Sequence, residues 1–368
     1  MSVHKDKNRN NWYVKYKNQT TRGFKTKTEA QRYEAKLKLS MITNENCSKV
    51  FFHDIVKDYE KYLYQRYKNS NITYGTYSKN KNVINRIIFK YTDNKKVNKI
   101  SEFDCRKFAG IVSDLNYTTV YKNFILNVYK AIFKHGIRYF GLIHNPSMII
   151  APLKKSFKEK MKQRETESNI WSIEEFNAFI KCVDKEVYRQ LFVILYYTGL
   201  RLGEALALQW KDFSDGYLHI NKSLTKKTEK GYYEIKETKN ISSIRDVELG
   251  HSLCMYLDKF KQEEMKSYGF SEDWFIFGRT MPLPETNIQR IKNNAIKEAN
   301  VKKIRLHDFR HSHASNLIAN GINIVAVSRR LGHSDVNMTL SVYTHLLKKN
   351  EVELVNYIDD SSQKLLHP

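Results

Sequence analysis

The chain has 368 residues, in which 63 Lys and Arg face 39 Asp and Glu, so its formal net charge is +24. At about 150 residues per domain this length allows two or three domains, and an aromatic content of 13% argues against wholesale disorder. The charge excess indicates a polyanionic partner, and a membrane is disfavoured because the longest apolar run, residues 191–197, is far shorter than the roughly 20 residues of a spanning helix.

Cysteine usage and the amino terminus indicate the compartment. Residues 1–11 contain no apolar stretch of the kind found in secretion signals. Glycine (14) and proline (5) are both scarce, so we expect a mostly helical, intracellular protein that binds nucleic acid. A disulfide framework and a structural zinc site are disfavoured because the four cysteines lie far apart without a CxxC pair: Cys47, Cys105, Cys182 and Cys254.

The first segment, residues 1–48, is strongly basic. Residues 12–17 alternate as in a half-buried strand, and residues 20–26 predict a second strand. Thr28 and Gln31 have the spacing of a helix capping box, so a short helix is expected to about Leu39. Such a small unit is either a solubilising arm or a sheet that lays charged side chains into a DNA groove.

Residues 49–152 predict a helical domain. Pro146 and Pro152 interrupt the helical pattern, and the polar, basic residues 153–169 are typical of an interdomain linker that can follow a phosphate backbone. Two stretches carry apolar side chains at helical spacing and are interpreted as core: Phe52, Ile55, Val56, Tyr59, Tyr62 and Leu63, then Tyr121, Phe124, Ile125, Val128 and Ile132.

The segment from residue 170 onward predicts a mixed domain. Ser172 and Glu175 form a capping box, and an apolar helix ends at Thr198 and Gly199. Strands are expected around residues 218–220, 232–235 and 245–249, and the remainder is helical again. No repeat of solenoid period is apparent.

Four short stretches of this segment are unusual together. They are TGLRLGE at 198–204, ETKNISSIR at 237–245, HDFRH at 307–311, and LGH at 331–333 followed by Tyr343. They supply arginines, a lysine, histidines and a tyrosine, without a carboxylate cluster suited to Mg²⁺.

These residue types suit cleavage of a DNA phosphodiester. Two guanidiniums, Arg201 and Arg310, could grip one phosphate and replace the charge neutralisation that metal ions give elsewhere. Free backbone N–H groups at the turn after Gly199 would add positive potential. A tyrosine becomes a nucleophile once a base takes its proton, and a lysine can protonate the leaving oxygen.

Each element alone has a plainer explanation. Arg201 and Glu204 could be a surface ion pair at i,i+3. Histidines such as His307 and His311 are more often satisfied core or cap residues than catalysts, and one tyrosine among 24 carries little weight. The order and the local patterns together favour the chemical interpretation.

TGLRLGEAL, HDFRH and LGHSDVNMTLSVYTH resemble the boxes of the tyrosine recombinase family, specifically phage and conjugative-element integrases, over about residues 171–347. The resemblance implies that Arg201 and Arg310 bind the scissile phosphate and that Tyr343 is the nucleophile. It further implies that Lys239 protonates the leaving 5′-oxygen, that His307 and His333 hydrogen-bond the phosphate, and that Glu204 is a supporting acid, without cofactor or metal.

Two positions depart from the family pattern. The family hairpin usually reads Lys-Thr, whereas here Lys239 precedes Asn240, so Lys236 stays open as a rival and Lys239 is favoured on its spacing to Ser243 and Arg245. Phe309 stands where the family often has Leu, an apolar exchange expected to matter little.

The remaining segments resemble the other integrase domains. Residues 1–48 resemble an arm-type DNA-binding domain with a small sheet plus helix, compressed to some 27 residues before the helix, which leaves a complete third strand open. Residues 49–152 resemble the helical core-binding domain, residues 153–169 are the linker, and residues 170–350 the catalytic domain. The apolar tail at 351–368 could dock on its own domain or on a neighbouring protomer.

The sequence thus predicts a mainly α protein with small β-sheets that recombines DNA through a 3′-phosphotyrosyl intermediate. The rival hypotheses are a type IB topoisomerase-like enzyme and a catalytically silent DNA-binding accessory factor. The resemblance implies double-stranded DNA with core and arm sites, a homotetramer on paired sites, a DNA-bending host factor, an excisionase and no membrane. A bacterial cytoplasmic, nucleoid-associated location is expected.

Overall fold

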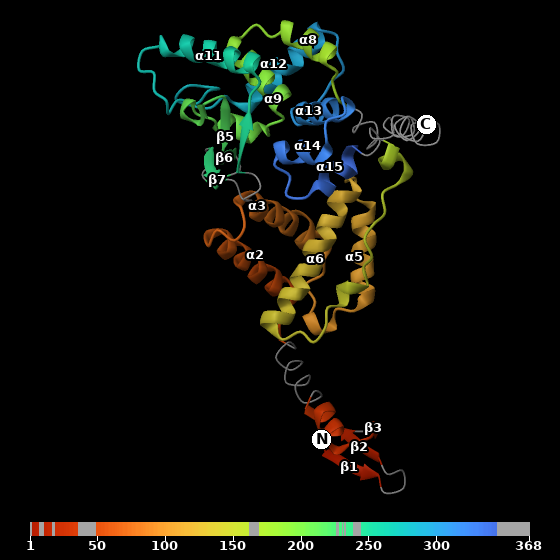
Figure 1. The fold of residues 1–368 in the computed structure, drawn as a ribbon. Coiled ribbons are helices and arrows are strands. Elements are labelled where there is room, and N and C mark those ends of the chain that lie inside the picture. The colour runs from red at the N-terminus through yellow and green to blue at the C-terminus, as the bar shows by residue number, and fades with distance from the viewer. Residues whose placement is uncertain are drawn as a thin grey trace, which may run out of the picture. The chain divides into compact units, whose positions relative to one another are not determined.

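The computed structural model is mostly helical with small antiparallel sheets, as the composition and the resemblance predict (Figure 1). It describes residues 2–6, 11–16, 19–35, 49–161, 169–225, 228–229, 231, 233–237 and 244–343. The chain divides into two compact units, Met1–Ser156 and Phe157–Pro368. Among the described helices, none is long and apolar enough to cross a membrane.

The first unit begins with a three-stranded sheet. Its strands are β1 (Ser2–Asp6), β2 (Asn11–Tyr16) and β3 (Gln19–Phe24), paired antiparallel in the order β1-β2-β3. The third strand, which the short segment left open, is complete, because Ser2–Asp6 pairs with β2 along its whole length. This strand carries a single apolar side chain, Val3, so pairing with β2 rather than hydrophobic pattern defines it.

The helix after this sheet covers residues 27–35 and begins earlier than predicted. Its capping residues are Thr26 and Glu29, not Thr28 and Gln31. The Thr26 hydroxyl accepts the Glu29 N–H at 3.1 Å, and the Glu29 carboxylate accepts the Lys25 N–H at 3.1 Å. Thr26–Glu29 and Thr28–Gln31 both have the spacing of a capping box. The first pair forms because the charged carboxylate of Glu29 is a stronger acceptor than the neutral amide of Gln31.

The rest of the first unit is helical. Both predicted apolar stripes pack into its core, where Phe52, Ile55, Val56, Ile125 and Ile132 are buried and Tyr62, Tyr121 and Phe124 are partly buried. The elements in chain order are α2 (Phe52–Lys68), α3 (Tyr74–Val83), the π-helical η1 (Ile84–Ile88), α4 (Phe89–Tyr91), η2 (Val97–Lys99), α5 (Glu102–Asp114), α6 (Thr119–Phe140) and η3 (Pro146–Ile149).

The chain leaving α6 folds back along that helix. The Asn123 side chain donates to the Leu153 carbonyl at 2.9 Å and accepts the Leu153 N–H at 2.8 Å. The Lys130 ammonium donates to the Ile150 carbonyl at 2.6 Å. The first residue of the predicted linker is therefore tied to the helical unit, while residues 162–168 lie outside the described residues.

The second unit surrounds two small sheets with helices. Strands β4 (Phe213–Ser214), β5 (Tyr217–Ile220) and β8 (Arg245–Glu248) form one sheet, and β6 (Lys222–Thr225) and β7 (Glu234–Glu237) form the other. The helices are α8 (Ile173–Lys181), α9 (Glu186–Thr198), α10 (Leu202–Ala207), η4 (Trp210–Asp212), α11 (His251–Met265), α12 (Glu285–Glu298), α13 (Asp308–Ala319), α14 (Ile324–Leu331) and α15 (Val336–Tyr343). The predicted capping box of Ser172 and Glu175 is confirmed.

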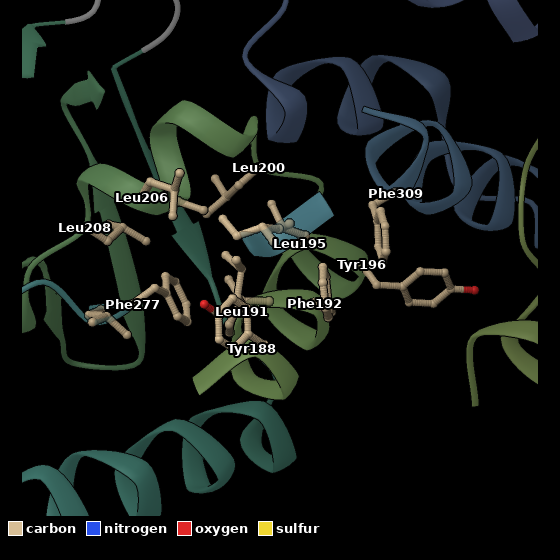
Figure 2. Close-up of a cluster of buried hydrophobic side chains, with 14 of the residues drawn as sticks. Tyr188, Leu191, Phe192, Leu195, Tyr196, Leu200, Leu206, Leu208, Phe277 and Phe309 are labelled. Carbon is tan, nitrogen blue, oxygen red and sulfur yellow. The ribbon is translucent and has the colours of Figure 1, made fainter. Parts of the chain in front are cut away.

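Helix α9 runs through the centre of this unit's core (Figure 2). Leu191 and Phe192 are fully buried, and the Phe192 ring stacks on the ring of Phe309 with centroids 5.5 Å apart. Phe309 lies in the first turn of α13 and is itself fully buried. The packing of α9 against α13 fixes where two of the predicted site segments, TGLRLGE and HDFRH, meet.

Candidate active site

The first site segment begins where α9 ends. Gly199 adopts a left-handed conformation with φ +67°, which ends the helix and leads into Arg201, the residue that caps α10. A Cβ at Gly199 would lie 2.6 Å from the ring of His313 and 2.8 Å from Leu331. The missing side chain therefore lets α13 and the end of α14 approach this turn.

Arg201 is held by Glu204. One guanidinium nitrogen of Arg201 donates to Oε1 of Glu204 at 2.6 Å, and the Arg201 backbone N–H donates to Oε2 at 3.0 Å. The explanation as a surface ion pair is wrong, because the Glu204 side chain is only 2% exposed. The Arg201 N–H, at the turn after Gly199, is bonded to Glu204. The Arg201 side chain stays 36% exposed and can meet a ligand.

A third arginine, Arg245, completes the pairing of Glu204. It donates to Oε2 of Glu204 at 3.0 Å and to the Arg330 carbonyl at 2.8 Å, and its side chain is 8% exposed. Burial by itself would raise the pKa of the Glu204 carboxyl, but Arg245 and Arg201 outweigh it, and the pKa is lowered from its ordinary value. Glu204 is therefore a buried carboxylate shared by two guanidiniums. The sequence predictions did not include Arg245 among the site residues, and in the sequence it stands out only as a charged residue at the start of a short strand.

Arg310 is almost fully buried and joins two helix ends. Its guanidinium donates to the carbonyl of Gly199 at 2.9 Å and to the carbonyl of Leu331 at 2.8 Å. The Gly332 carbonyl next to it accepts from Arg201 at 3.5 Å. Arg201 and Arg310 therefore bond to adjacent carbonyls at the end of α14, which brings the two predicted phosphate-binding arginines to one place.

The two predicted histidines share this region. His307 caps α13, and its ring meets the ring of His311 edge-on with centroids 4.9 Å apart. His333 follows the left-handed Gly332, and its Nδ1 lies 2.7 Å from the hydroxyl of Thr339 on α15. The structure thus gathers His307, His333 and both arginines.

Both histidines are neutral at neutral pH. Burial, followed by the charges of His311 and Arg310, lowers the pKa of His307 to about 4. Burial, followed by the charges of Arg310 and Arg201, lowers the pKa of His333 to about 4. A neutral imidazole offers one N–H donor and one acceptor, so each ring can donate a hydrogen bond to a phosphate oxygen without adding charge, or accept a proton and become a cation.

The side chains of two predicted site residues, Lys239 and Tyr343, lie outside the part of the chain that the structure describes. Lys236, the rival of Lys239, lies on β7 and pairs with Glu234 at 3.0 Å. Tyr343 is the last residue of α15. Among the described residues there is no group of three His, Cys, Asp or Glu side chains that could hold a metal ion.

Comparisons with known proteins agree on one family. Residues 171–350 match the sequence profile described as "Phage integrase family". The ICEBs1 integrase of Bacillus subtilis (strain 168) is 29% identical over 292 residues, which cover 77% of each chain. The integrase of Staphylococcus phage L54a is 25% identical over 348 residues, covering 88% of this chain and 97% of that protein.

Solved structures share the fold. The Tn1549 transposon integrase in complex with a circular intermediate DNA matches with a TM-score of 0.64 and 17% identity, covering 80% of this chain and 95% of that one. A lambda integrase dimer bound to a COC′ core site matches with a TM-score of 0.60 and 17% identity, covering 93% of this chain and 94% of that one.

Proposed function

The chain belongs to the phage integrase family of tyrosine recombinases, enzymes that cut and rejoin DNA, and from this premise we propose which of its residues perform the reaction. Arg201 and Arg310 hold the scissile phosphate, His307 and His333 bond its oxygens, and Tyr343 attacks it. The observation that carries this proposal is that Arg201 and Arg310 bond to the adjacent carbonyls of Gly332 and Leu331, while His307 and His333 both lie close enough for the charges of these arginines to lower their pKa.

The proposed reaction exchanges one ester for another. The phenolic oxygen of Tyr343 forms a bond to phosphorus as the bond from phosphorus to the 5′-oxygen breaks. A neighbouring base takes the phenolic proton, and Lys239, or its rival Lys236, gives a proton to the departing 5′-oxygen. The products are a 3′-phosphotyrosyl ester and a 5′-hydroxyl, and attack by a 5′-hydroxyl of a second strand rejoins DNA and releases the tyrosine.

The guanidiniums stabilise the transition state by charge. Arg310 is nine-tenths or more buried and bonds to neutral carbonyls, so its positive charge acts in a surrounding of low polarity, where it is worth more than in water. Arg201 is more exposed and bonds to the neighbouring Gly332 carbonyl, so its guanidinium is the one that solvent and a ligand can reach. His307 and His333 donate N–H bonds to the phosphate without repelling the two arginines.

The biological role is integration and excision of a mobile genetic element. The full-length relatives are named integrases, one of the element ICEBs1 and one of a phage. A type IB topoisomerase or a silent accessory factor is not favoured, because these relatives are recombinases and the predicted arginines and histidines assemble. We place the enzyme in the bacterial cytoplasm, on the nucleoid.

The domains divide the DNA between them in this proposal. Residues 1–48 bind arm sites, residues 49–152 bind core sites, residues 153–169 follow the backbone, and residues 170–350 catalyse. The small sheet supports the first role with basic groups on aromatic rings: Arg22 lies 5.9 Å from the Tyr13 ring and Lys27 lies 5.8 Å from the Trp12 ring.

Assembly follows the same proposal. A lambda integrase tetramer bound to a Holliday junction matches this chain with a TM-score of 0.58 and 16% identity, which supports a homotetramer on paired sites. The tail at 351–368 docks on its own domain or on a neighbouring protomer. A DNA-bending host factor and an excisionase complete the set of partners.

A nicked suicide substrate tests the proposal. The wild-type chain should form a covalent protein–DNA adduct that survives denaturation. The short fragment between the cleavage site and the nick carries the 5′-hydroxyl, and once it diffuses away the strand cannot be rejoined. Tyr343→Phe should bind the same DNA and form no adduct. Tyr197→Phe, a matched control at a 41% exposed tyrosine of the same unit, should form the adduct normally. An adduct with Tyr343→Phe would overturn the assignment of the nucleophile.

A further inference from the structure

We propose that Arg245 is a positioning residue of the recombination reaction: it keeps the Arg201 guanidinium available to the scissile phosphate by sharing Glu204 and by fixing the end of α14. This inference rests on the proposed function, since it assumes that Arg201 binds the phosphate. Arg245 begins strand β8 and pairs with Ile220 of β5, so its backbone belongs to a sheet and not to any of the site helices.

Three consecutive carbonyls at the end of α14 each accept from a different arginine. The Arg330 carbonyl accepts from Arg245 at 2.8 Å, the Leu331 carbonyl from Arg310 at 2.8 Å, and the Gly332 carbonyl from Arg201 at 3.5 Å. A shift of this short run would move the acceptors of both phosphate-binding arginines together, and His333 follows it directly. Arg245 fixes the run from the side of the sheet.

The charges around Glu204 give Arg245 a second role. Glu204 is 2% exposed, so its carboxylate requires a compensating charge. With Arg245 in place, two guanidiniums share one carboxylate, and a net positive charge remains for the phosphate. Without Arg245, the Arg201 guanidinium would have to neutralise Glu204, and its attraction for an incoming phosphate would fall.

The lowered pKa of Glu204 agrees with this arrangement. Although burial opposes the charged form, the charge of Arg245 and its hydrogen bond are the largest effects that favour the carboxylate, ahead of those of Arg201. Arg245 therefore shares the compensation of Glu204 with Arg201, although it lies 41 residues away in the chain.

The matched control is a second largely buried ion pair of the same unit. Lys222 on β6 pairs with Asp212 at 2.8 Å, with side chains 16% and 7% exposed, and also donates to Gln209 at 2.7 Å. Lys222→Met removes a buried cation from a sheet strand, as Arg245→Met does, but the described contacts of Lys222 involve none of the proposed site residues. The two variants should lower thermal stability comparably.

The experiment measures single-turnover cleavage of the suicide substrate by the full chain at saturating DNA, together with DNA affinity and thermal unfolding. Arg245→Met should cleave about ten- to a hundredfold more slowly. Losses of this size are typical in metalloenzymes when a residue that orients a metal ligand through a hydrogen bond is removed, and Arg245 would orient Arg201 in a comparable way. Lys222→Met should cleave at the wild-type rate. Adding Glu204→Gln to Arg245→Met should restore part of the lost rate, because the uncompensated carboxylate is gone.

Two results would overturn the inference. One is an Arg245→Met chain that cleaves as fast as wild type, or no more slowly than Lys222→Met at equal stability. The other is a double variant without any recovery of rate, which would mean that Arg245 does not act through the charge of Glu204. If the wild-type chain itself forms no adduct, the proposed function fails instead, so the two failures are distinguishable.

Discussion

Arg201 and Arg310 both donate to carbonyls at the end of α14, but their other partners differ. Arg310 is buried and donates to the neutral carbonyl oxygens of Gly199 and Leu331, which hold its guanidinium in place without cancelling its charge. Arg201 is partly exposed and donates to the carboxylate of Glu204, a charge that Arg245 shares. One arginine is thus firmly placed and the other is accessible, a division that suits two guanidiniums binding one phosphate.

Arg310→Lys is expected to slow cleavage by about a hundredfold or more, the loss typical of removing one charge-stabilising donor. A lysine ammonium keeps the charge but lacks the planar fork that reaches the carbonyls of Gly199 and Leu331 together. The measurement is single-turnover cleavage of the suicide substrate. Arg189→Lys, a change at a 37% exposed arginine, is the control and should cleave normally. A wild-type rate for Arg310→Lys would contradict the account.

The lowered pKa values of His307 and His333, both about 4, make stability depend on pH. A histidine in an unfolded chain has a pKa of about 6.5. Between pH 6.5 and 4 the unfolded chain therefore binds more protons than the folded one. Stability is therefore full above pH 6.5 and is lost as pH falls towards 4. Urea unfolding at a series of pH values should show a shallower loss for His333→Gln than for wild type. Parallel curves would contradict the shift at His333.

At the scale of elements, the site depends on helices that end at glycines. Helix α9 ends at Gly199 and α14 at Gly332, with φ +67° and +70°. Both ends could be predicted, because glycine in the TGL and LGH boxes is a direct signal for a helix end. Arg245 could not be predicted as a member of the site, because its partners Glu204 and Arg330 meet it only through tertiary packing.

The other misses have similar causes. Strand β1 has almost no apolar pattern, so only its pairing with β2 reveals it. Thr26 and Thr28 each begin a capping-box motif, so the sequence predicts either as the helix cap equally well. Only the hydrogen bond from the Glu29 N–H to the Thr26 hydroxyl decides between them. The Arg201–Glu204 pair was visible from its spacing, but its burial was not, since burial follows from packing between segments distant in sequence.

Gly199→Ala should destabilise the chain more than Gly269→Ala. Both glycines have positive φ, and an alanine there costs about 1–2 kcal/mol of backbone strain. Gly269 has open space around it, whereas a Cβ at Gly199 would lie 2.6 Å from the His313 ring. Urea unfolding should therefore give a clearly larger loss of free energy for Gly199→Ala, with slower cleavage. Equal losses would show that the close approach of α13 is not required.

At the scale of the whole molecule, most of the +24 charge lies in the first unit, where 31 Lys and Arg face 11 Asp and Glu over residues 1–156, and it far exceeds what the reaction uses. Only Arg201, Arg310 and one hairpin lysine are assigned to chemistry. The remaining basic residues, among them those of segments 1–48 and 153–169, are suited to phosphate contacts that position the enzyme without reading sequence.

The salt dependence of DNA binding should reveal this division. The logarithm of the binding constant should fall with the logarithm of salt concentration by about 0.9 for each phosphate contacted. Deleting residues 1–48 should reduce this slope on DNA that contains arm sites and leave it unchanged on core DNA. Filter binding of both chains to both DNAs over a salt series measures it. A flat response, or equal loss of slope on both DNAs, would contradict the domain assignment.

The central claim is that Tyr343 carries the covalent bond to DNA. The most direct measurement is to trap the wild-type adduct on a nicked substrate, digest it with nuclease and protease, and locate the attached nucleotide by mass spectrometry. The account predicts a 3′-phosphodeoxynucleotide on the peptide that contains Tyr343. The same modification on any other of the 24 tyrosines would contradict it.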